Sequence, residues 1–353
     1  MHKLILFITA FFLCVQVSAQ TGGNNTYEFL NLSSSARIAA LGGKLIPVKD
    51  NDLNLVFCNP AVLNSEMHQQ LTFSGVSYFA DIKYGYVAYA RDIKKLGSFA
   101  AGMHYVNYGD FTETDAAGQE LGEFKAAEYA LNLSWARPLV SDSTLTIGTT
   151  LKTIYSSLED YSSFGLAVDL GVNYYLPESM FNFSLVAKNA GRQLTYYTAG
   201  NNEPLPFEIV FGVSKRLAKA PFRFSVNYTH IEKFDLSYQD PVKASEIDPI
   251  TGEPNDEKIS FGDKLLPHFI LGTELLLSKN FHVRGGYNFQ RRKELGVESK
   301  MSTVGITWGF GFRISKFHFS YGRAIYHLAG ASNHFSLSAN LGEFFTRKNT
   351  VLQ

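Results

Sequence analysis

Three groups of residues have types and spacings that could do chemistry, and the first is acidic. Asp50, Asp52 and Asn54 have the spacing that opens a calcium-binding loop. Such a loop also needs a glycine at its turn and a glutamate as its last ligand, but the sequence has Leu55 and Ala61 at those places. We therefore interpret this group as a polar turn, and we expect no metal site and no cofactor.

The second group is basic and the third is again acidic. Arg291, Arg292 and Lys293 form a cluster in a predicted loop. Guanidinium groups bind phosphates in pairs of hydrogen bonds, so this cluster predicts contact with lipopolysaccharide, or else an ordinary solvated loop. The segment 232–267 is punctuated by prolines, and it predicts a docking surface for a protein partner or a solubilising cover. Its candidate contact residues are Asp248, Glu253, Asp256 and Glu257.

The sequence has none of the common catalytic motifs. It lacks the G-x-S-x-G, H-E-x-x-H, C-x-x-C and S-x-x-K patterns and a Walker loop, so we expect no enzymatic activity. Its 32 basic residues are balanced by 32 acidic residues, which gives no overall field that would attract nucleic acid. Any electrostatic partner must therefore be recognised by a local patch.

The first residues predict export. Lys3 gives a charged start, residues 4–17 are apolar, and Val17-Ser18-Ala19 is a small-residue cleavage site. We predict a signal peptide over residues 1–19, because a retained membrane helix needs about 20 apolar residues. Its removal takes Cys14 away and leaves Cys58 alone, so the sequence predicts no disulfide framework.

Alternation of apolar and polar residues recurs from residue 70 almost to the end. Phe222, Phe224, Val226 and Tyr228, for example, alternate with polar residues. Such alternation predicts strands with one apolar face, and most of the segments have the roughly 9–11 residues of a tilted membrane strand. Fourteen strands are predicted: 70–78, 82–91, 97–108, 123–136, 144–157, 164–175, 181–188, 207–216, 222–231, 268–277, 281–289, 303–312, 316–325 and 334–341. We therefore expect an all-β fold, a transmembrane antiparallel β-barrel over residues 70–341 with a periplasmic tail over residues 342–353.

The lengths of the connections predict an orientation. Single-chain bacterial barrels have short periplasmic turns and longer external loops. With the N-terminus in the periplasm, the periplasmic connections are all short, and the external ones are long, such as residues 109–122 and 232–267, with residues 79–81 as the exception. We therefore expect a multi-pass outer-membrane protein whose loops face the cell exterior. Trp135 and Trp308, together with Tyr84 and Tyr86, are assigned to an interfacial aromatic girdle.

Residues 20–69 lack sustained alternation and predict short helices and turns. Ser33 or Ser34 is expected to cap a helix over residues 36–41, which Gly42 and Gly43 end. We expect this segment to fold into the lumen as a hatch, with a disordered periplasmic extension as the alternative.

Two family resemblances rest on particular segments. Residues 36–43, 50–52 and 59–61 resemble the N-terminal hatch of outer-membrane barrels related to the long-chain fatty-acid transporter, which assigns Arg37, Asn59 and Pro60 to that hatch. Nearly the whole mature chain resembles the PorQ-like outer-membrane components of the type IX secretion system of Bacteroidetes. That resemblance rests on residues 27–32, 202–208, 220–224, 248–254, 286–292 and 315–341.

The PorQ-like resemblance implies a non-enzymatic attachment role. PorQ-like barrels hold the surface protein PorZ, which works with the sortase PorU and the shuttle barrel PorV to join cargo to anionic lipopolysaccharide. The expected mechanism is anchoring, in which external loops of the barrel dock a PorZ-like protein. The alternatives are a transporter of hydrophobic small molecules, which predicts an apolar pocket near the hatch and a lateral gap between strands, and a PorV-like cargo shuttle. A general diffusion pore is disfavoured because the hatch would fill the lumen.

Overall fold

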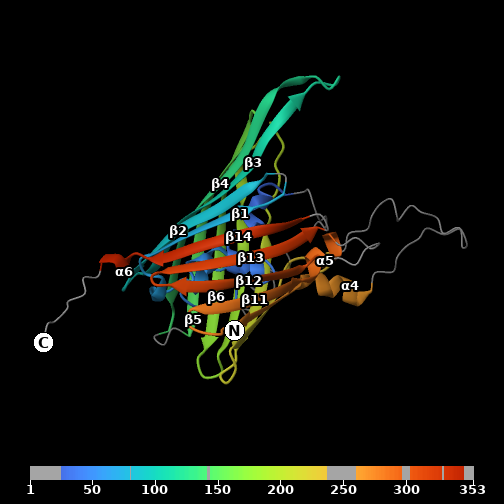
Figure 1. Ribbon diagram of the computed structural model, residues 1–353. Helices are drawn as coiled ribbons and strands as arrows, with labels where there is room; N and C mark the ends of the chain where they lie inside the picture. Colours follow the sequence, from blue (N-terminus) through green and yellow to red (C-terminus); the bar gives the residue numbers. More distant parts are fainter. Residues whose placement is uncertain are drawn as a thin grey trace, which may run out of the picture.

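A closed barrel of fourteen antiparallel strands is the main feature of the structure (Figure 1), a computed structural model that describes residues 25–79, 81–140, 144–236, 260–295, 303–327 and 330–345. Each strand pairs with its neighbours in sequence, and β1 pairs with β14 to close the barrel. The strands are β1 (Gln70–Ser77), β2 (Lys83–Ile93), β3 (Gly97–Thr114), β4 (Glu120–Pro138), β5 (Leu145–Leu158), β6 (Tyr161–Leu176), β7 (Phe181–Thr195), β8 (Glu208–Arg216), β9 (Phe222–Tyr228), β10 (Phe269–Leu275), β11 (Phe281–Asn288), β12 (Ile306–Ile314), β13 (Phe317–His327) and β14 (Gly330–Asn340). The predicted fold class is confirmed.

The alternation of residues sorts side chains between the lumen and the outer surface. In β9, Phe224 and Val226 are exposed on the outside, while Ser225 and Asn227 are buried on the inside. The same pattern repeats around the barrel, so the outer surface carries large apolar side chains and the inner wall is largely polar. A closed barrel with an apolar exterior is the arrangement that spans an outer membrane with strands.

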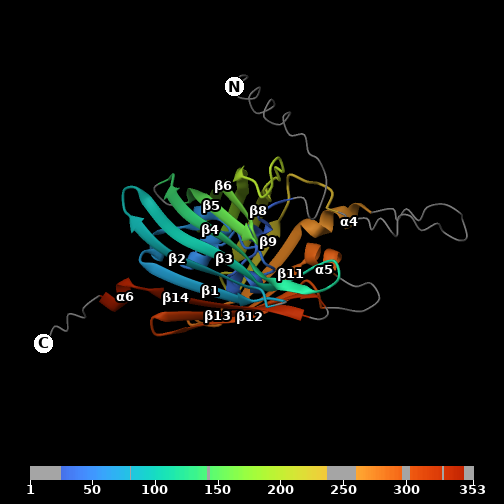
Figure 2. The same ribbon diagram turned by 90° about the horizontal axis from the view of Figure 1, so that it is seen from above.

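Residues 25–69 fold inside the barrel as short helices, which we call the plug. These are η1 (Glu28–Asn31), α2 (Ala36–Ala40), η2 (Leu53–Phe57), η3 (Pro60–Val62) and η4 (Ser65–Met67). In Figure 2 their blue segments lie between β4–β6 on one side and β12–β14 on the other. Ile38, Leu41, Leu53 and Leu55 are fully buried, because the plug provides the apolar filling of the lumen. The predicted luminal hatch is confirmed.

The helix cap of α2 differs from the prediction. The cap is Ser35, whose side chain accepts a hydrogen bond from the backbone N–H of Ile38. The prediction of Ser33 or Ser34 was wrong because three serines in a row offer the same side chain in adjacent places. Gly42 and Gly43 do end the helix, both with positive φ, as a chain reversal after a helix requires.

Two tyrosines assigned to the aromatic girdle face the lumen instead. Tyr84 and Tyr86 are buried against the plug, and the ring of Tyr86 lies edge-on to Phe57 with centroids 5.5 Å apart. They face inward because the plug makes this part of the lumen apolar, so that tyrosine packs well on the inner wall as well as on the outer one. Trp308 is exposed on the outer face, as expected.

Four short helices lie among or after the later strands: α4 (Phe261–Leu265), η5 (Leu266–His268), α5 (Phe289–Leu295) and α6 (Gly342–Phe345). No helix in the described ranges has the length and apolar character needed to cross a membrane. The predicted signal peptide and most of the predicted tail lie outside the described residues.

Candidate functional site

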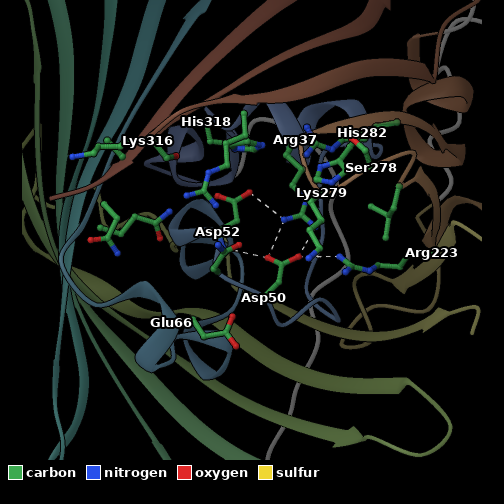
Figure 3. Close-up of a pocket in the computed structure, with 18 of the residues that line it drawn as sticks. Arg37, Asp50, Asp52, Glu66, Arg223, Ser278, Lys279, His282, Lys316 and His318 are labelled. Atoms are coloured by element: carbon green, nitrogen blue, oxygen red, sulfur yellow. Dashed lines mark hydrogen bonds and ion pairs between the residues drawn. The ribbon is translucent and has the colours of Figure 1, made fainter. Parts of the chain in front are cut away.

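Arg37 ties the plug to the barrel wall. Its guanidinium donates to both carboxylate oxygens of Glu274 on β10, at 2.9 and 3.0 Å. It also donates to Asp50 at 2.8 and 3.0 Å and to Asp52 at 3.2 Å, both within the plug (Figure 3). Because the Arg37 side chain is only 7% exposed, these charge-assisted bonds act with little screening by water.

The barrel wall supplies its half of this network from three adjacent strands. Glu274 lies directly opposite Arg223 of β9 on one side and opposite Arg284 of β11 on the other. Arg223 bonds Glu274 at 3.0 Å and also reaches Asp50 of the plug at 2.9 Å. Arg284 bonds Glu274 at 3.1 Å. Three guanidinium groups therefore face three carboxylates. Each buried charge has a partner of opposite sign, and some of these pairs join the plug to the wall.

The ionisation of Asp50 reflects this arrangement. Burial alone would raise the pKa of its carboxyl group, but Arg37 and Arg223 outweigh that effect and hold the pKa well below its usual range. Asp50 is therefore charged at any physiological pH, and the attachment of the plug depends on that charge.

A second attachment uses close backbone contact at Asn59 and Pro60. The fully buried Asn59 donates to the carbonyl of Ile46 at 2.9 Å and accepts from the N–H of Ala61 at 2.9 Å, which caps η3. Gly148 of β5 lies against Pro60, and a Cβ placed on that glycine would come within 2.4 Å of the Pro60 carbonyl carbon. The glycine is thus needed for the plug backbone to approach the wall.

The plug also bonds both strands that close the barrel. The side-chain oxygen of Asn54 accepts from Thr72 and Ser74 of β1, both at 3.1 Å. The backbone N–H of Ala36 donates to Ser336 of β14 at 2.9 Å. The seam between the first and last strands is therefore held from the inside as well as by its own ladder of hydrogen bonds.

A polar cavity of about 620 Å³ lies beside the charge network (Figure 3). Arg37 and Asp50 line it from the plug, while His282 and His318 line it from the wall. Lys279 and residues of other short turns form its rim, so it lies at the end of the barrel where the short connections are. Within the ranges that the structure covers, no three His, Cys, Asp or Glu side chains are grouped as a metal would require. The cavity is a charged vestibule to which the network contributes Arg37, Asp50, Asp52, Arg223 and Arg284, and polar residues outside the network complete its lining.

The predicted basic cluster lies on α5 at the opposite end. The Arg291 guanidinium stacks on the Tyr326 ring, 4.0 Å from its centroid, and donates to its hydroxyl at 3.2 Å. Lys293 donates to the backbone carbonyl of Asp263 at 2.8 Å, and Arg292 is half-buried. The structure thus brings the three residues onto one short helix but directs Arg291 and Lys293 toward different neighbours. The predicted contact residues Asp248, Glu253, Asp256 and Glu257 lie outside the described residues.

Among known proteins, the chain is similar only to barrels of solved structure. No protein-family model and no curated protein matches the chain. The toluene transporter TodX of Pseudomonas putida is similar at a TM-score of 0.49 and 11% identity, over 88% of this chain and 99% of that one. A FadL homologue of Pseudomonas aeruginosa is similar at 0.45 and 11% identity, over 87% and 97%. The KdgM porin reaches 0.30 and 5% identity, over 76% and 98%. The fold assignment rests on the strand pairing of this chain itself.

The sequence placed Arg37 in the hatch but did not reveal the wall residues of its network, of which Glu274 bonds Arg37 directly. Arg223, Glu274 and Arg284 each occupy a lumen-facing position in a strand whose outward positions are mostly apolar. A charged residue at an inward position of a barrel strand was the available signal. The pairing itself joins residues more than 170 positions apart, which alternation within one strand does not reveal.

Proposed function

We propose that this chain is an outer-membrane mount, a plugged barrel that fixes surface segments in place so that a soluble partner can dock on them. The observation that carries the proposal is the attachment of the plug, in which buried Arg37 bonds Glu274 of the wall and two carboxylates of its own segment. A plug fixed in this way suits a barrel that holds segments in position better than one that conducts.

The identity of the partner comes from the sequence resemblance. PorQ-like barrels of the type IX secretion system hold the surface protein PorZ, so a PorZ-like protein, working with PorU and PorV, is the proposed partner. The proposed orientation places the long connections outside the cell and the vestibule in the periplasm. Contact of Arg291, Arg292 and Lys293 with lipopolysaccharide stays a prediction. It would be seen as salt-sensitive binding that weakens when the three charges are removed.

Transport of hydrophobic small molecules is the second candidate, and one observation favours it. Tyr27, Phe29 and Leu30 of the plug form a buried apolar cluster with the wall residues Tyr84 and Val106. This cluster is where an apolar ligand would bind if the plug moved. Toluene transport is named for TodX, and it indicates only the class of ligand to test. This alternative also predicts a lateral gap; among the described residues every strand pairs with both of its neighbours over part of its length, and the β6–β7 ladder is interrupted between Val168 and Leu170.

Affinity purification of the tagged full-length chain from outer membranes in mild detergent tests the two candidates together. The mount predicts recovery of a PorZ-like surface protein in a defined ratio to the barrel. The transporter predicts a bound fatty acid or aromatic hydrocarbon, seen by mass spectrometry of the extracted lipid fraction. Recovery of such a ligand without a protein partner would overturn the mount. An unrelated outer-membrane barrel, tagged and purified in the same way, is the control for adventitious lipid.

A further inference from the structure

The hairpin of β3 and β4 leaves the barrel wall and continues as a separate two-stranded ribbon (Figure 1). Up to Val106 and from Ala126 onward, side chains alternate between buried and exposed. Between them the alternation stops, and nearly every residue from Asp110 to Glu123 is exposed on both faces. We call residues 109–125 the arm. Among the described residues, the hydrogen bonds, ion pair and ring contact of the arm join it to itself, to neighbouring strand residues or to the β5–β6 turn.

Both edges of the arm are free beyond its base, where the carbonyl of Lys125 accepts a hydrogen bond from the N–H of Glu159 at 3.1 Å. The pairing of β3 with β2 ends at Asn107, and the pairing of β4 with β5 begins at Ala126. Within the arm, β3 and β4 continue to pair with each other, for example Phe111 with Phe124. In the part of the chain that the structure describes, no third strand pairs with either edge. A free two-stranded ribbon is marginally stable in water, and its unpaired N–H and C=O groups form a template for another chain.

The arm exposes apolar side chains and carries negative charge. The rings of Phe111 and Phe124 stack with centroids 5.1 Å apart, and Leu121 is 62% exposed at the tip. The arm has five carboxylates and one cation, Lys125, so its net charge is −4. The carboxylates are Asp110, Glu113, Asp115, Glu120 and Glu123.

The negative charge of the arm indicates which kind of molecule could bind there. Lipopolysaccharide phosphates would repel it, and so would the same arm on a second copy of the chain. A protein whose contact face is basic would be attracted, and its own strand could pair with a free edge while its apolar side chains cover Phe111 and Leu121.

We propose that the arm is the docking surface for the soluble partner, and that the partner presents a basic face to it. This inference rests on the proposed mount and names its interface. The free edges give affinity through backbone hydrogen bonds, the exposed apolar side chains give the centre of the contact, and the carboxylates steer the approach.

Two variants of the full-length barrel test the arm. The first replaces residues 112–123 by Asn-Gly, which joins the paired Phe111 and Phe124 by a two-residue turn. The second carries Glu113→Gln and Glu120→Gln and leaves the ribbon intact. Its matched control carries Glu159→Gln and Asp160→Asn, which neutralises two exposed carboxylates at the same end, in the turn between β5 and β6. Heat-modifiable migration on gels verifies that each barrel folds.

The probe is the surface protein recovered with the wild-type chain, purified and titrated against each barrel. We expect the shortened arm to weaken binding by at least about a hundredfold. The charge variant should weaken binding severalfold at about 50 mM salt, and the loss should shrink at about 500 mM, while the control binds like wild type.

The outcomes separate the two proposals. If the wild-type chain recovers its partner and the shortened arm binds it equally well, the arm is not the interface although the mount stands. If the wild-type chain recovers no protein, the mount fails and the arm proposal fails with it. A photo-crosslinker placed at Leu121 gives an independent answer, because crosslinks to lipopolysaccharide or to a second copy of the chain would refute the basic partner.

Discussion

Replacing Arg37 by leucine should release the plug without unfolding the barrel. The substitution removes every bond between the guanidinium and its three carboxylates, and it leaves Asp52 without the arginine that it contacts in the plug. Removing one partner of a buried ion pair costs about 3–5 kcal/mol. The lower end of that range applies here, because Arg223 and Arg284 still compensate Glu274. The expected cost of about 3 kcal/mol falls on the local opening of the plug.

Cys58 provides the assay for plug opening. It lies at the end of η2, is 3% exposed and is unpaired. The other cysteine, Cys14, lies in the predicted signal peptide. A maleimide reagent reaches Cys58 only when the plug opens, so about 3 kcal/mol corresponds to labelling roughly a hundredfold faster or more. The rate would be measured in detergent at constant pH, with gel migration as the test that the barrel stays folded.

An exposed ion pair supplies the control. Lys125 lies 3.5 Å from Asp110, and their side chains are 81% and 63% exposed. Exposed pairs contribute about 0–1 kcal/mol, so Lys125→Met should leave the labelling of Cys58 unchanged. If Cys58 in Arg37→Leu is also labelled at the wild-type rate, the charge network does not hold the plug. The observation that carries the proposed mount would then no longer support it.

Three further predictions concern acid, close contact and the lipid-facing surface. The pKa of Asp50 is depressed in the folded state, so its stabilising effect is complete above the unfolded value of about 4 and is lost as the pH falls further. The urea concentration at the midpoint of plug opening should therefore decrease in the wild type as the pH is lowered below 4, and it should decrease less in Asp50→Asn. Parallel pH profiles for the two proteins would contradict this. Gly148→Val should displace Pro60 and raise the rate of Cys58 labelling. Gly75→Ala, whose Cβ meets nothing within 4 Å, should leave that rate unchanged. If Gly148→Val labels at the wild-type rate, the wall moves at Gly148 to make room for the side chain. Phe335→Lys places a charge where the side chain is 58% exposed on the outer face, and should cost up to about 2–4 kcal/mol in lipid vesicles; a free energy of unfolding equal to that of wild type would indicate that this face does not meet lipid.

The barrel was predictable from the sequence because alternation is a local property. Phe224, Ser225 and Val226 take opposite faces by the geometry of a strand, whatever lies around them. The arm was predicted as a loop instead, since residues 109–122 contain glycines and charges and do not alternate. A ribbon with water on both faces has no apolar face to alternate with, so only its pairing reveals it.

The site was less predictable because it depends on contacts between distant segments. Arg37 was assigned to the hatch, yet nothing near it in the sequence indicates Glu274 as its partner. Tyr84 and Tyr86 have the same difficulty, since the side of the wall that receives an aromatic ring depends on what fills the lumen.

The bonds between the plug and the seam have a consequence for the order of assembly. The plug precedes in sequence every strand that it touches, and Ala36 bonds Ser336, three hundred residues later. Asn54 meanwhile bonds Thr72 and Ser74 of the first strand. Bonds spanning such separations form late, since the intervening chain must first be ordered. The plug therefore gains its full set of partners only when the first and last strands meet, and it favours the closed ring over any open sheet that precedes it.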